Sequence, residues 1–345
     1  MNVIVIATSA KTRGGITSVI KSHMEGYQWT QYNCRWIETH IDKGPLSKIL
    51  IFIEGLMKYL FYLPSASLVH IHFSEPTSAK RKKIFLILAK ILQKKTIVHF
   101  HSFSPETTIC GPHSELYRYL FSKADLVVVL SNYWKEKVNN AYDLGEKVRV
   151  IYNPCTATIN KKIYHKTNCI LYAGTLNKRK GYADLISAFA KVAPKYPDWY
   201  LALAGNGETK EAKELSRSFG IEEKVKLLGW VSGESKDRAY KEASIFCLPS
   251  YAEGFPMAVL DAWAYGLPVI TTPVGGIPDI AKDGENLLLF NPGDIDKLSA
   301  NIEYLINNEE KRILLSKASL NLAATTFNID TINNQIGDLY NELLS

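Results

Sequence analysis

Two acidic residues, eight positions apart, flank a short loop and the start of a helix in the second half of the chain. The segment reads EGFPMAVLD, from Glu253 to Asp261. Gly254 permits a tight turn and the close approach of a ligand, and Pro256 suits the first position of a helix, where its missing N–H costs nothing. A helix that begins at Met257 directs unpaired N–H groups and the positive end of its dipole at the loop, which favours phosphate binding. The segment therefore predicts an anion site beside carboxylates that can hold sugar hydroxyl groups.

A basic turn upstream supplies candidate cations. The stretch AGTLNKRKGYADLI follows an apolar run and places Arg179 and Lys180 immediately before Gly181, where a helix is expected to begin. Fixed cations stabilise the negative charge that develops on a leaving phosphate, and they need no metal ion to do so. A basic turn alone is most often solvated, but together with the acidic segment it favours a diphosphate-binding role for Lys180 and Arg179.

Short β-branched runs alternate with amphipathic segments along the whole chain, and this alternation predicts parallel sheets covered by helices on both faces. The alternation stops near residues 153–166 and then restarts, which predicts two doubly wound, Rossmann-like α/β domains in tandem. Ligands of such sheets bind at the carboxyl ends of the strands, so the loops there are the expected sites. We expect the first of these domains at residues 1–155, the second at 156–327 and a C-terminal helix at 328–345.

The segment PSYAEGFPMAVLDAWAYGLPVITTPVGGIPDI, residues 249–280, resembles the signature of the retaining glycosyltransferases of family 4. The resemblance extends from the glycine pair near the start of the chain to NLLLFNPGD at residues 286–294. It implies the GT-B fold, in which two Rossmann-like domains face a cleft, and a C-terminal helix that crosses back to the first domain. Residues 1–155 are then the acceptor-side domain and residues 156–327 the nucleotide-sugar-binding domain. It also implies a nucleotide-sugar donor, with UDP-sugars favoured over GDP-sugars, and neither metal nor other cofactor.

The resemblance also assigns roles to individual residues. Glu253 corresponds to the acid that positions the sugar, and Asp261 to the acid that binds the ribose. The expected catalytic group is His101, Lys180 and Glu253. The expected donor-binding residues are Gly14, Gly15, Arg179, Gly205, Trp230, Val231, Gly254, Phe255, Pro256, Met257 and Asp261. Two positions depart from the family pattern, because Asp261 stands where Glu is usual and Thr175 where Arg is usual; Arg179 is the expected substitute for the missing cation.

Two His-x-His pairs, His70 with His72 and His99 with His101, end consecutive predicted strands. Alternation places each pair on one face of its strand, and four imidazoles on neighbouring strands are one way to build a metal site. No suitably spaced acidic ligands accompany them, so we expect no metal. His101 matches the family histidine that faces the donor sugar, and His99 is expected to be a packed strand residue.

The charge of the chain is uneven. Of the net +7, residues 1–150 carry 20 Lys and Arg against 11 Asp and Glu, and the rest carries 21 against 23, so the halves hold +9 and −2. Residues 80–95, KRKKIFLILAKILQKK, place seven cations around helically spaced apolar residues. This segment is equally compatible with docking on an anionic membrane surface and with an ordinary scaffold helix. No aromatic-interleaved basic face indicates nucleic-acid binding.

The remaining composition indicates a cytoplasmic globular protein, peripheral to the inner face of the membrane if the basic helix docks there. The five cysteines are scattered and form no C-x-x-C pair, so neither a disulfide framework nor a structural zinc site is expected. The favoured function is transfer of a hexosyl or N-acetylhexosaminyl group to a saccharide or lipid-linked acceptor in bacterial surface polysaccharide assembly. A sugar-nucleotide epimerase of the same fold and a non-catalytic, membrane-associated nucleotide-sugar-binding module remain as alternatives.

Overall fold

The computed structural model of the chain describes residues 1–155 and 167–345. The chain divides into two compact units. Unit 1 comprises Met1–Thr156 and Asn328–Ser345, and unit 2 comprises Ala157–Phe327. The boundary expected near residues 153–166 falls largely outside the described residues.

Unit 1 is built on a six-stranded parallel sheet with the strand order β2-β1-β3-β4-β5-β6. The strands are β1 Val3–Ala7, β2 Arg35–Glu38, β3 Leu68–Phe73, β4 Lys95–Phe100, β5 Leu126–Val129 and β6 Val148–Val150. From β1 the chain first adds β2 on one side and then β3 on the other, so the direction of strand addition reverses between β1 and β3. The loops after β1 and β3 therefore leave the sheet at its topological switch point, where such folds bind ligands.

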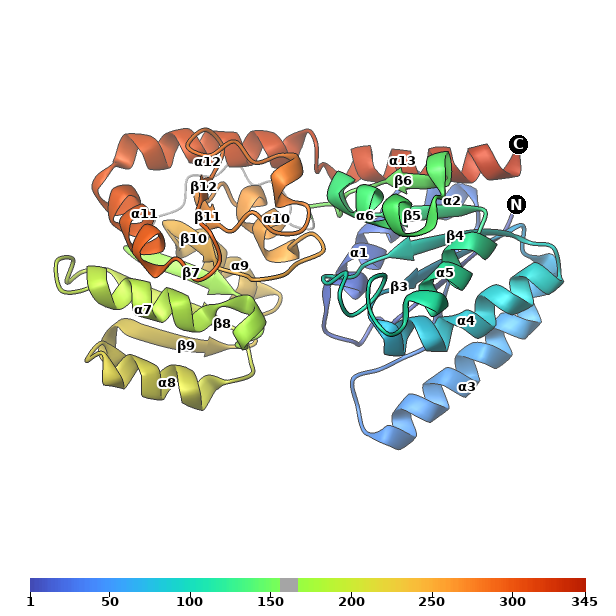
Figure 1. Cartoon of the computed structure of the whole chain (residues 1–345), viewed down its shortest axis with the longest axis horizontal. Helices are drawn as coiled ribbons and strands as arrows, with labels where there is room; N and C mark the ends of the chain where they lie inside the picture. The colour runs from blue at the N-terminus through green and yellow to red at the C-terminus, as the bar shows by residue number, and fades with distance from the viewer. Residues whose placement is uncertain (156–166) are drawn as a thin grey trace. The chain divides into compact units, whose positions relative to one another are not determined.

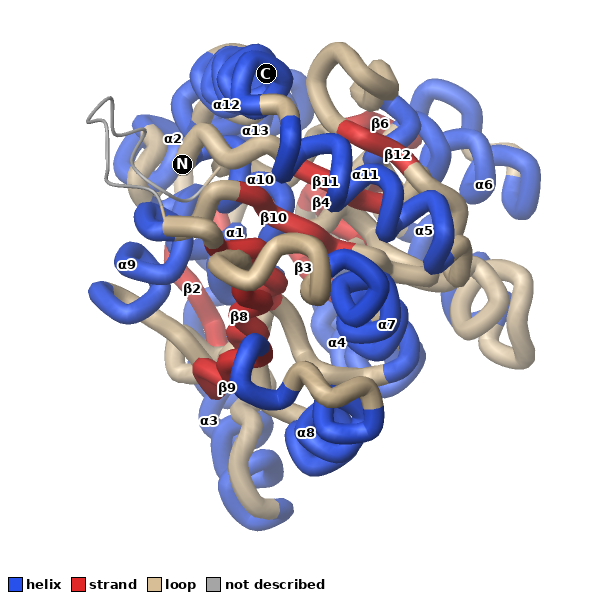
Figure 2. Tube along the Cα trace, turned by 90° about the vertical axis from the view of Figure 1, so that its left-hand side faces the viewer, coloured by secondary structure: helices blue, strands red, loops and turns tan. Residues whose placement is uncertain are grey.

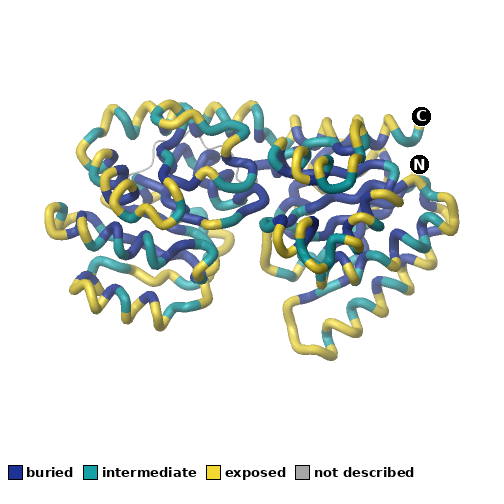
Figure 3. Tube along the Cα trace, in the orientation of Figure 1, coloured by how far each residue is buried: buried dark blue, intermediate teal, exposed yellow. Residues whose placement is uncertain are grey.

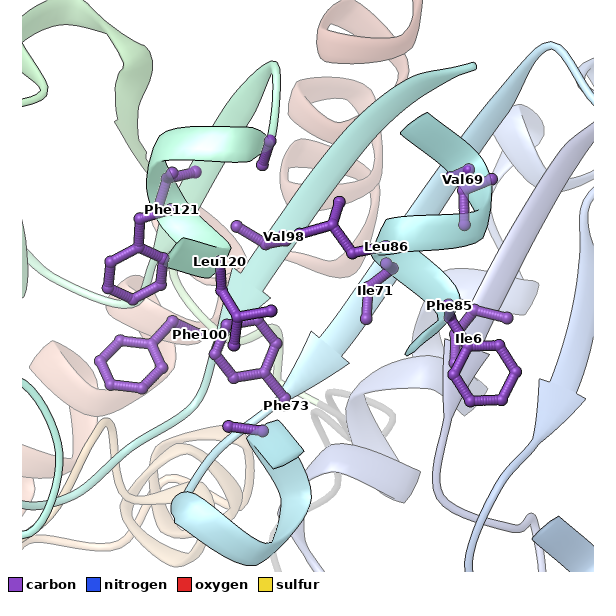
Figure 4. Packing of buried hydrophobic residues seen from close by; sticks show 14 of the residues in the cluster. Ile6, Val69, Ile71, Phe73, Phe85, Leu86, Val98, Phe100, Leu120 and Phe121 are labelled. Atoms are coloured by element: carbon purple, nitrogen blue, oxygen red, sulfur yellow. The ribbon is translucent and has the colours of Figure 1, made fainter. Parts of the chain in front are cut away.

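Helices cover both faces of this sheet (Figure 1). They are α1 Gly15–Met24, α2 Tyr27–Gln31, α3 Pro45–Tyr62, α4 Pro76–Ile91, α5 Ser114–Lys123, α6 Asn132–Tyr142 and α13 Ile329–Leu344, with the 3-10 turns η1 Leu63–Ser65 and η2 Gly145–Lys147. One face packs against α3, α4, α5 and α6 through an aromatic-rich core. Figure 4 shows Phe73 and Phe100 of the strands beside Phe121 of α5, and Phe85 and Leu86 of α4 farther along the sheet.

The opposite face of the sheet is covered by α1, α2 and α13. The expectation that the C-terminal helix returns to the first domain is confirmed, because Ile332, Ile336 and Tyr340 of α13 lie in the core of unit 1. The odd-numbered strand residues of β1 pack toward this face and the even-numbered ones toward the other, as the period of a strand requires. Figure 3 shows the central strands of each unit as buried, whereas the edge strands, β2 in unit 1 and residues 225–229 in unit 2, are partly exposed.

Unit 2 contains a second six-stranded parallel sheet, with the order β12-β11-β10-β7-β8-β9. Its strands are β7 Cys169–Ala173, β8 Tyr200–Ala204, β9 Val225–Gly229, β10 Ile245–Leu248, β11 Val269–Thr271 and β12 Leu288–Leu289. Its helices are α7 Tyr182–Val192, α8 Thr209–Ser218, α9 Glu234–Glu242, α10 Met257–Ala264, α11 Ile295–Asn307 and α12 Glu309–Ala324, with the 3-10 turns η3 Lys178–Lys180, η4 Glu222–Lys224 and η5 Ile277–Asp279. Figure 2 shows the strands and helices of both units by colour. The order reverses between β7 and β10, so the switch point of unit 2 lies between the loops that follow these two strands.

The predicted fold of two doubly wound parallel-sheet domains is thus confirmed. Strand β2 was not expected, because its sequence RWIE is short and partly exposed and lacks the apolar run of a central strand. It lies at the edge of the sheet, where short polar strands are common. His101 was expected inside a strand, but β4 ends at Phe100 and His101 is the first residue of the following loop.

Candidate functional site

The predicted catalytic residues of unit 2, together with Arg179, lie on the two loops at its switch point. Lys180 and Arg179 belong to η3, which follows β7, and Glu253 lies on the loop between β10 and α10. These loops are 73 residues apart in sequence but adjacent at the carboxyl ends of neighbouring strands. The structure therefore brings together the acid and the cations that the sequence placed in separate segments.

Glu253 forms the centre of this group. Its side chain is 8% exposed. Its Oε1 accepts hydrogen bonds from Lys180 Nζ at 2.5 Å and from Ser250 Oγ at 2.7 Å, and its Oε2 lies 3.5 Å from Arg179 NH1. Arg179 NH1 also donates to the Ala252 carbonyl at 2.6 Å. One buried carboxylate thus holds two cations in fixed positions.

The charge state of Glu253 follows from these contacts. Burial by itself would raise the pKa of this carboxyl, but the positive charges of Lys180 and Arg179 and the hydrogen bonds from Lys180 and Ser250 outweigh it. The pKa of Glu253 is held below its ordinary value of 4.5. Glu253 is therefore ionised at neutral pH, and the group of one carboxylate and two cations retains a net positive charge that suits a diphosphate.

The turn that carries Lys180 requires a glycine. Asn177 Oδ1 accepts a hydrogen bond from the Lys180 N–H at 3.0 Å and caps the short turn. Gly181 has φ +69°, and a Cβ atom there would come within 2.0 Å of the Pro249 carbonyl oxygen. The close approach of the two loops is thus possible only without a side chain at Gly181.

The loop after Glu253 leads into α10 as expected, with one difference. The helix begins at Met257, but Pro256 occupies the N-cap position and not the first helical position. Gly254 accepts a hydrogen bond from Gly276 N–H at 2.8 Å, and Gly275 approaches so closely that a Cβ atom would lie 2.4 Å from the Glu253 and Gly254 carbonyl oxygens. The start of α10 therefore has a fixed position beside Glu253. The N–H groups of Val259 and Leu260 donate to the Pro256 carbonyl oxygen, whereas those of Met257 and Ala258 precede the first acceptor of the helix.

Two of the predicted donor-binding residues have a defined structural role. Phe255 is 4% exposed and its ring contacts Phe327 with centroids 5.1 Å apart, so its side chain belongs to the core. A Cβ atom on Gly205 would lie 1.8 Å from the Gly174 carbonyl oxygen, so Gly205 allows the loop after β8 to pack against the loop after β7. Trp230 and Val231 follow β9, and Trp230 is 41% exposed.

Asp261 has a partner that sequence reasoning missed. Asp261 is 6% exposed, and its Oδ2 lies 2.7 Å from Nζ of Lys236 on α9. Lys236 stands in the charged helix sequence ESKDRAYKE, where no local signal separates it from surface lysines. The shorter carboxylate at this position is thus joined to a cation, and Lys236 becomes an additional candidate of the site.

The predicted residues of unit 1 lie at the carboxyl ends of its strands. Gly14, with φ +154°, is the N-cap residue of α1, and Gly15 is the first residue of that helix. No atom would lie within 4 Å of a Cβ added at Gly14, so this turn leaves space for a ligand. His101 follows β4, and its Nε2 lies 2.9 Å from Nδ1 of His72. The nitrogen of His101 that remains for a ligand is therefore Nδ1.

The four histidines of the two His-x-His pairs lie on one face of the sheet, and His23 of α1 joins them. The rings are stacked, with interplanar angles of 5° between His70 and His99, 30° between His72 and His99, and 22° between His99 and His101. Nitrogen atoms of His70, His72 and His99 lie within 4.8 Å of one another. The lone pair of an imidazole nitrogen lies in the plane of its ring. In stacked rings these planes are nearly parallel, so the lone pairs do not converge on one metal ion. The expectation of no metal remains a prediction.

Burial keeps these histidines neutral. The pKa values of His70, His72 and His99 are held well below 6.5, mainly by burial and further by the neighbouring histidines. Burial also lowers the pKa of His23 to about 4 and that of His101 to about 3. Asn333 and Tyr340 of α13 bind Nδ1 of His23 and of His70, at 2.9 and 2.8 Å.

The basic segment at residues 80–95 lies mostly in α4, which packs on β3, β4 and α5. Lys82 is fully buried and Lys90 pairs with Asp125 at 2.8 Å, so the segment does not present seven cations to one surface. None of the helices in the described part of the chain has the length and hydropathy required to cross a bilayer.

Both units of the chain match known families of glycosyltransferases. The family described as "Glycosyl transferases group 1" matches residues 157–321, and "Glycosyltransferase Family 4" matches residues 31–157. An uncharacterized glycosyltransferase of Haemophilus influenzae is 32% identical over 54% of this chain and 52% of its own length. The lipopolysaccharide 1,6-galactosyltransferase of Salmonella typhimurium is 30% identical over 66% of this chain and 65% of its own length. The matched region thus spans about half to two thirds of these curated relatives.

Solved structures show the same fold over almost the whole chain. HepE of Anabaena in complex with UDP superposes with a TM-score of 0.78 at 19% identity, covering 99% of this chain and 100% of that one. Sucrose-phosphate synthase of Thermosynechococcus elongatus superposes with a TM-score of 0.81 at 19% identity, covering 99% and 98%. The two family matches together cover residues 31–321. The chain therefore belongs to the family 4 type of glycosyltransferases with the GT-B fold.

Proposed function

We propose that the protein transfers a sugar from a nucleotide-diphosphate sugar to an acceptor hydroxyl group, with retention of the anomeric configuration. The group of Glu253, Lys180 and Arg179 beside the start of α10 carries this proposal. It combines two cations, unpaired helix N–H groups and an ionised carboxylate at a switch point. A diphosphate fits the positive elements, and sugar hydroxyl groups fit the carboxylate.

The chemistry that we propose needs no nucleophile from the protein. The acceptor oxygen forms a bond to the anomeric carbon on the face from which the diphosphate departs, while the bond from that carbon to the phosphate oxygen breaks. The acceptor proton passes to the departing phosphate. Lys180 and Arg179 stabilise the charge on the leaving group, Glu253 positions the sugar, and Asp261 accepts from the ribose.

The donor is a UDP-sugar and the acceptor a growing surface saccharide in this proposal. Structures of fold relatives contain UDP, as in HepE and in the pneumococcal O-GlcNAc transferase GtfA with UDP and GlcNAc. Relatives are named for lipopolysaccharide and amylovoran biosynthesis. We propose that the transferred group is hexosyl or N-acetylhexosaminyl, and that the protein works in the cytoplasm without a metal.

A donor screen tests the proposal. Thermal unfolding with UDP, GDP, ADP and their sugars should show a Tm increase with UDP and UDP-sugars. Saccharide acceptors are then added with the best donor, and NMR of the product reports whether the anomeric configuration is retained. Epimer formation without an acceptor would instead indicate an epimerase, and donor binding without turnover would indicate a binding module.

Replacing Lys180 with Met should weaken transfer strongly, because a cation at the diphosphate is lost. We expect kcat/KM for the donor to fall about 10²- to 10³-fold. Loss of Lys180 also removes the main interaction that lowers the pKa of Glu253, so burial should move the acid limb of the rate profile to higher pH. Kinetics across pH 4–8 measure both effects. Lys178→Met, an exposed neighbour in the same turn, is the matched control and should leave both unchanged.

We also propose that unit 1 docks on an anionic membrane surface, through α3 and not through residues 80–95. Seven large apolar side chains of α3 are exposed, namely Leu46, Ile49, Leu50, Ile53, Met57, Leu60 and Phe61. They recur every three or four residues, so they share one side of the helix, and Figure 3 shows much of α3 as exposed. The exposed Lys43 and Lys48 flank the start of the helix. An exposed apolar stripe with lysines at its end fits an anionic lipid surface.

The double variant Leu50→Asp/Met57→Asp should reduce binding to phosphatidylglycerol-containing vesicles by about tenfold or more, since each buried apolar side chain contributes about 1.5 kcal/mol. Vesicle sedimentation measures the change. Ile313→Asp/Leu314→Asp on α12, two similarly exposed apolar residues of unit 2, is the control. Equal binding of both variants and the unaltered protein would contradict docking through α3.

A further inference from the structure

A lysine occupies a core position of α4. The buried residues of this helix are Ala79, Lys82, Phe85, Leu86 and Ala89, which recur every three or four residues and form the stripe that faces the sheet. Lys82 is 0% exposed. An apolar side chain is the ordinary occupant of such a position, because transfer of an ammonium group out of water is costly unless a counter-charge compensates it.

No counter-charge accompanies Lys82 in the described part of the chain. Its Nζ donates to Ser78 Oγ at 3.2 Å, and no carboxylate oxygen of the described residues lies within 4.0 Å. Glu75, the acid at the start of the helix, already accepts hydrogen bonds from Ser102 Oγ at 2.7 Å and from Thr107 Oγ1 at 2.5 Å. Burial, and to a lesser extent Arg81, lowers the pKa of Lys82 well below 10.5, and no acid raises it.

Arg81, the neighbour of Lys82 in the sequence, is also partly desolvated and lacks an acidic partner within 4.0 Å among the described residues. Its Nε is buried and has no hydrogen-bond partner among the described residues. Burial lowers the pKa of Arg81, and Asp42 opposes this at long range without forming an ion pair within 4.0 Å. Two adjacent, desolvated cations without an acidic partner form an incomplete group, which an anionic ligand would complete.

The position of this group in the fold is that of a ligand site. α4 follows β3, and β3 and β1 enclose the switch point of the unit 1 sheet. Long helical side chains lean toward the N-terminus of their helix, and the bond from Lys82 to Ser78 runs in this direction. The ammonium group is thus directed toward the carboxyl ends of the strands. His101, at the end of β4, is near enough for the charge of Lys82 to lower its pKa further, after burial and His23.

We propose that Lys82, with Arg81 and Ser78, binds a phosphoryl group of a substrate at the switch point of unit 1. A phosphate offers several acceptor oxygens and the negative charge that the two cations lack. The two possible sources are a phosphorylated acceptor and the diphosphate of the donor. This inference rests on the proposed function for the identity of the substrate, whereas the binding site itself is independent of it.

The amine of Lys82 is not needed to pack α4 against the sheet, so its removal tests whether it serves a ligand. Lys82→Met keeps the length of the side chain and removes the desolvated amine. If the lysine serves a ligand, the ligand-free variant should be more stable than the unaltered protein, with a Tm higher by roughly 3–6 °C. Lys80→Met, an exposed lysine on the same helix, is the matched control and should leave the Tm unchanged.

Calorimetric titration of the full-length chain measures phosphate binding, with pyrophosphate as the probe, first alone and then with UDP in excess. A donor-diphosphate site loses its pyrophosphate binding when UDP is added, and a site for a phosphorylated acceptor keeps it. The unaltered protein and Lys80→Met should bind pyrophosphate, and Lys82→Met should bind it about 10- to 100-fold more weakly. Arg81→Gln should show a smaller loss in the same direction. UDP affinity is then measured for every variant without pyrophosphate.

Unchanged UDP affinity in Lys82→Met assigns the site to a phosphorylated acceptor, and a parallel loss of UDP affinity assigns it to the donor diphosphate. Either result supports the phosphate site. A folded Lys82→Met variant that binds pyrophosphate and UDP as well as the unaltered protein does overturns it. If UDP fails to bind the unaltered protein, the proposed function fails, while the pyrophosphate titration still decides the fate of the Lys82 site.

Discussion

Lowering the pH from 7.5 to 5.5 should destabilise the protein by about 5 kcal/mol through four buried histidines. His23, His70, His72 and His99 are at most 3% exposed, and burial holds their pKa values well below 6.5, to about 4 for His23. Below pH 6.5 these histidines become protonated in the unfolded chain, whereas in the folded chain they stay neutral. The contribution of the neutral histidines to the free energy of unfolding is therefore fully present above pH 6.5. It is lost as the pH falls from 6.5 toward the pKa values of the histidines in the folded protein.

This loss is comparable to the whole stability of an ordinary domain, which is about 5–15 kcal/mol. Urea unfolding at several pH values, followed by circular dichroism, measures it. His99→Leu should reduce the pH dependence by one proton, about 1.4 kcal/mol per pH unit, and His113→Leu, outside the cluster, should leave it unchanged. A urea midpoint that does not move between pH 7.5 and 5.5 would show that the histidines do not remain neutral in the folded protein.

Glu253→Gln should lower kcat about 10²- to 10³-fold while UDP affinity stays the same or increases. The amide keeps the shape of the side chain and a hydrogen bond with Ser250, but it removes the charge that positions the sugar. Lys180 and Arg179 then no longer share their charge with a carboxylate and interact more strongly with a diphosphate. The variant thus separates the catalytic role of the acid from the binding role of the cations.

Steady-state kinetics and UDP titration measure the two effects. Because the side chains of Lys180 and Arg179 are 15% and 29% exposed, water compensates part of the lost interaction. The stability cost should therefore stay below the roughly 3–5 kcal/mol of a fully buried pair. Glu285→Gln, an exposed loop acid of unit 2, is the control. If kcat of Glu253→Gln stayed within threefold of the unaltered protein, the carboxylate would have no part in the transfer step.

Local sequence patterns predicted most of the central elements of the fold. Runs such as LVHIHF and CILYA are apolar enough to identify buried parallel strands, and the start of α10 at Met257 follows from the glycine and proline before it. The short edge strand β2 was missed because it has only one neighbouring strand, so its sequence lacks the continuous apolar run of a central strand. The burial of Lys82 was not predicted, since the run KRKK gives no local sign of which lysine faces the sheet.

The sequence alone determined which residue types stand on which loops: an acid before α10, cations before α7 and histidines at the ends of β3 and β4. These placements follow from short-range patterns, which depend only on a residue and its close neighbours in the sequence. Only the tertiary structure decided the partners, namely Glu253 with Lys180, Asp261 with Lys236, and Lys82 with no acid among the described residues. The physical reason is that strand order decides which loops meet at a switch point, and burial decides which charges must be compensated. Both are properties of the packed sheet and have no local signal in the chain.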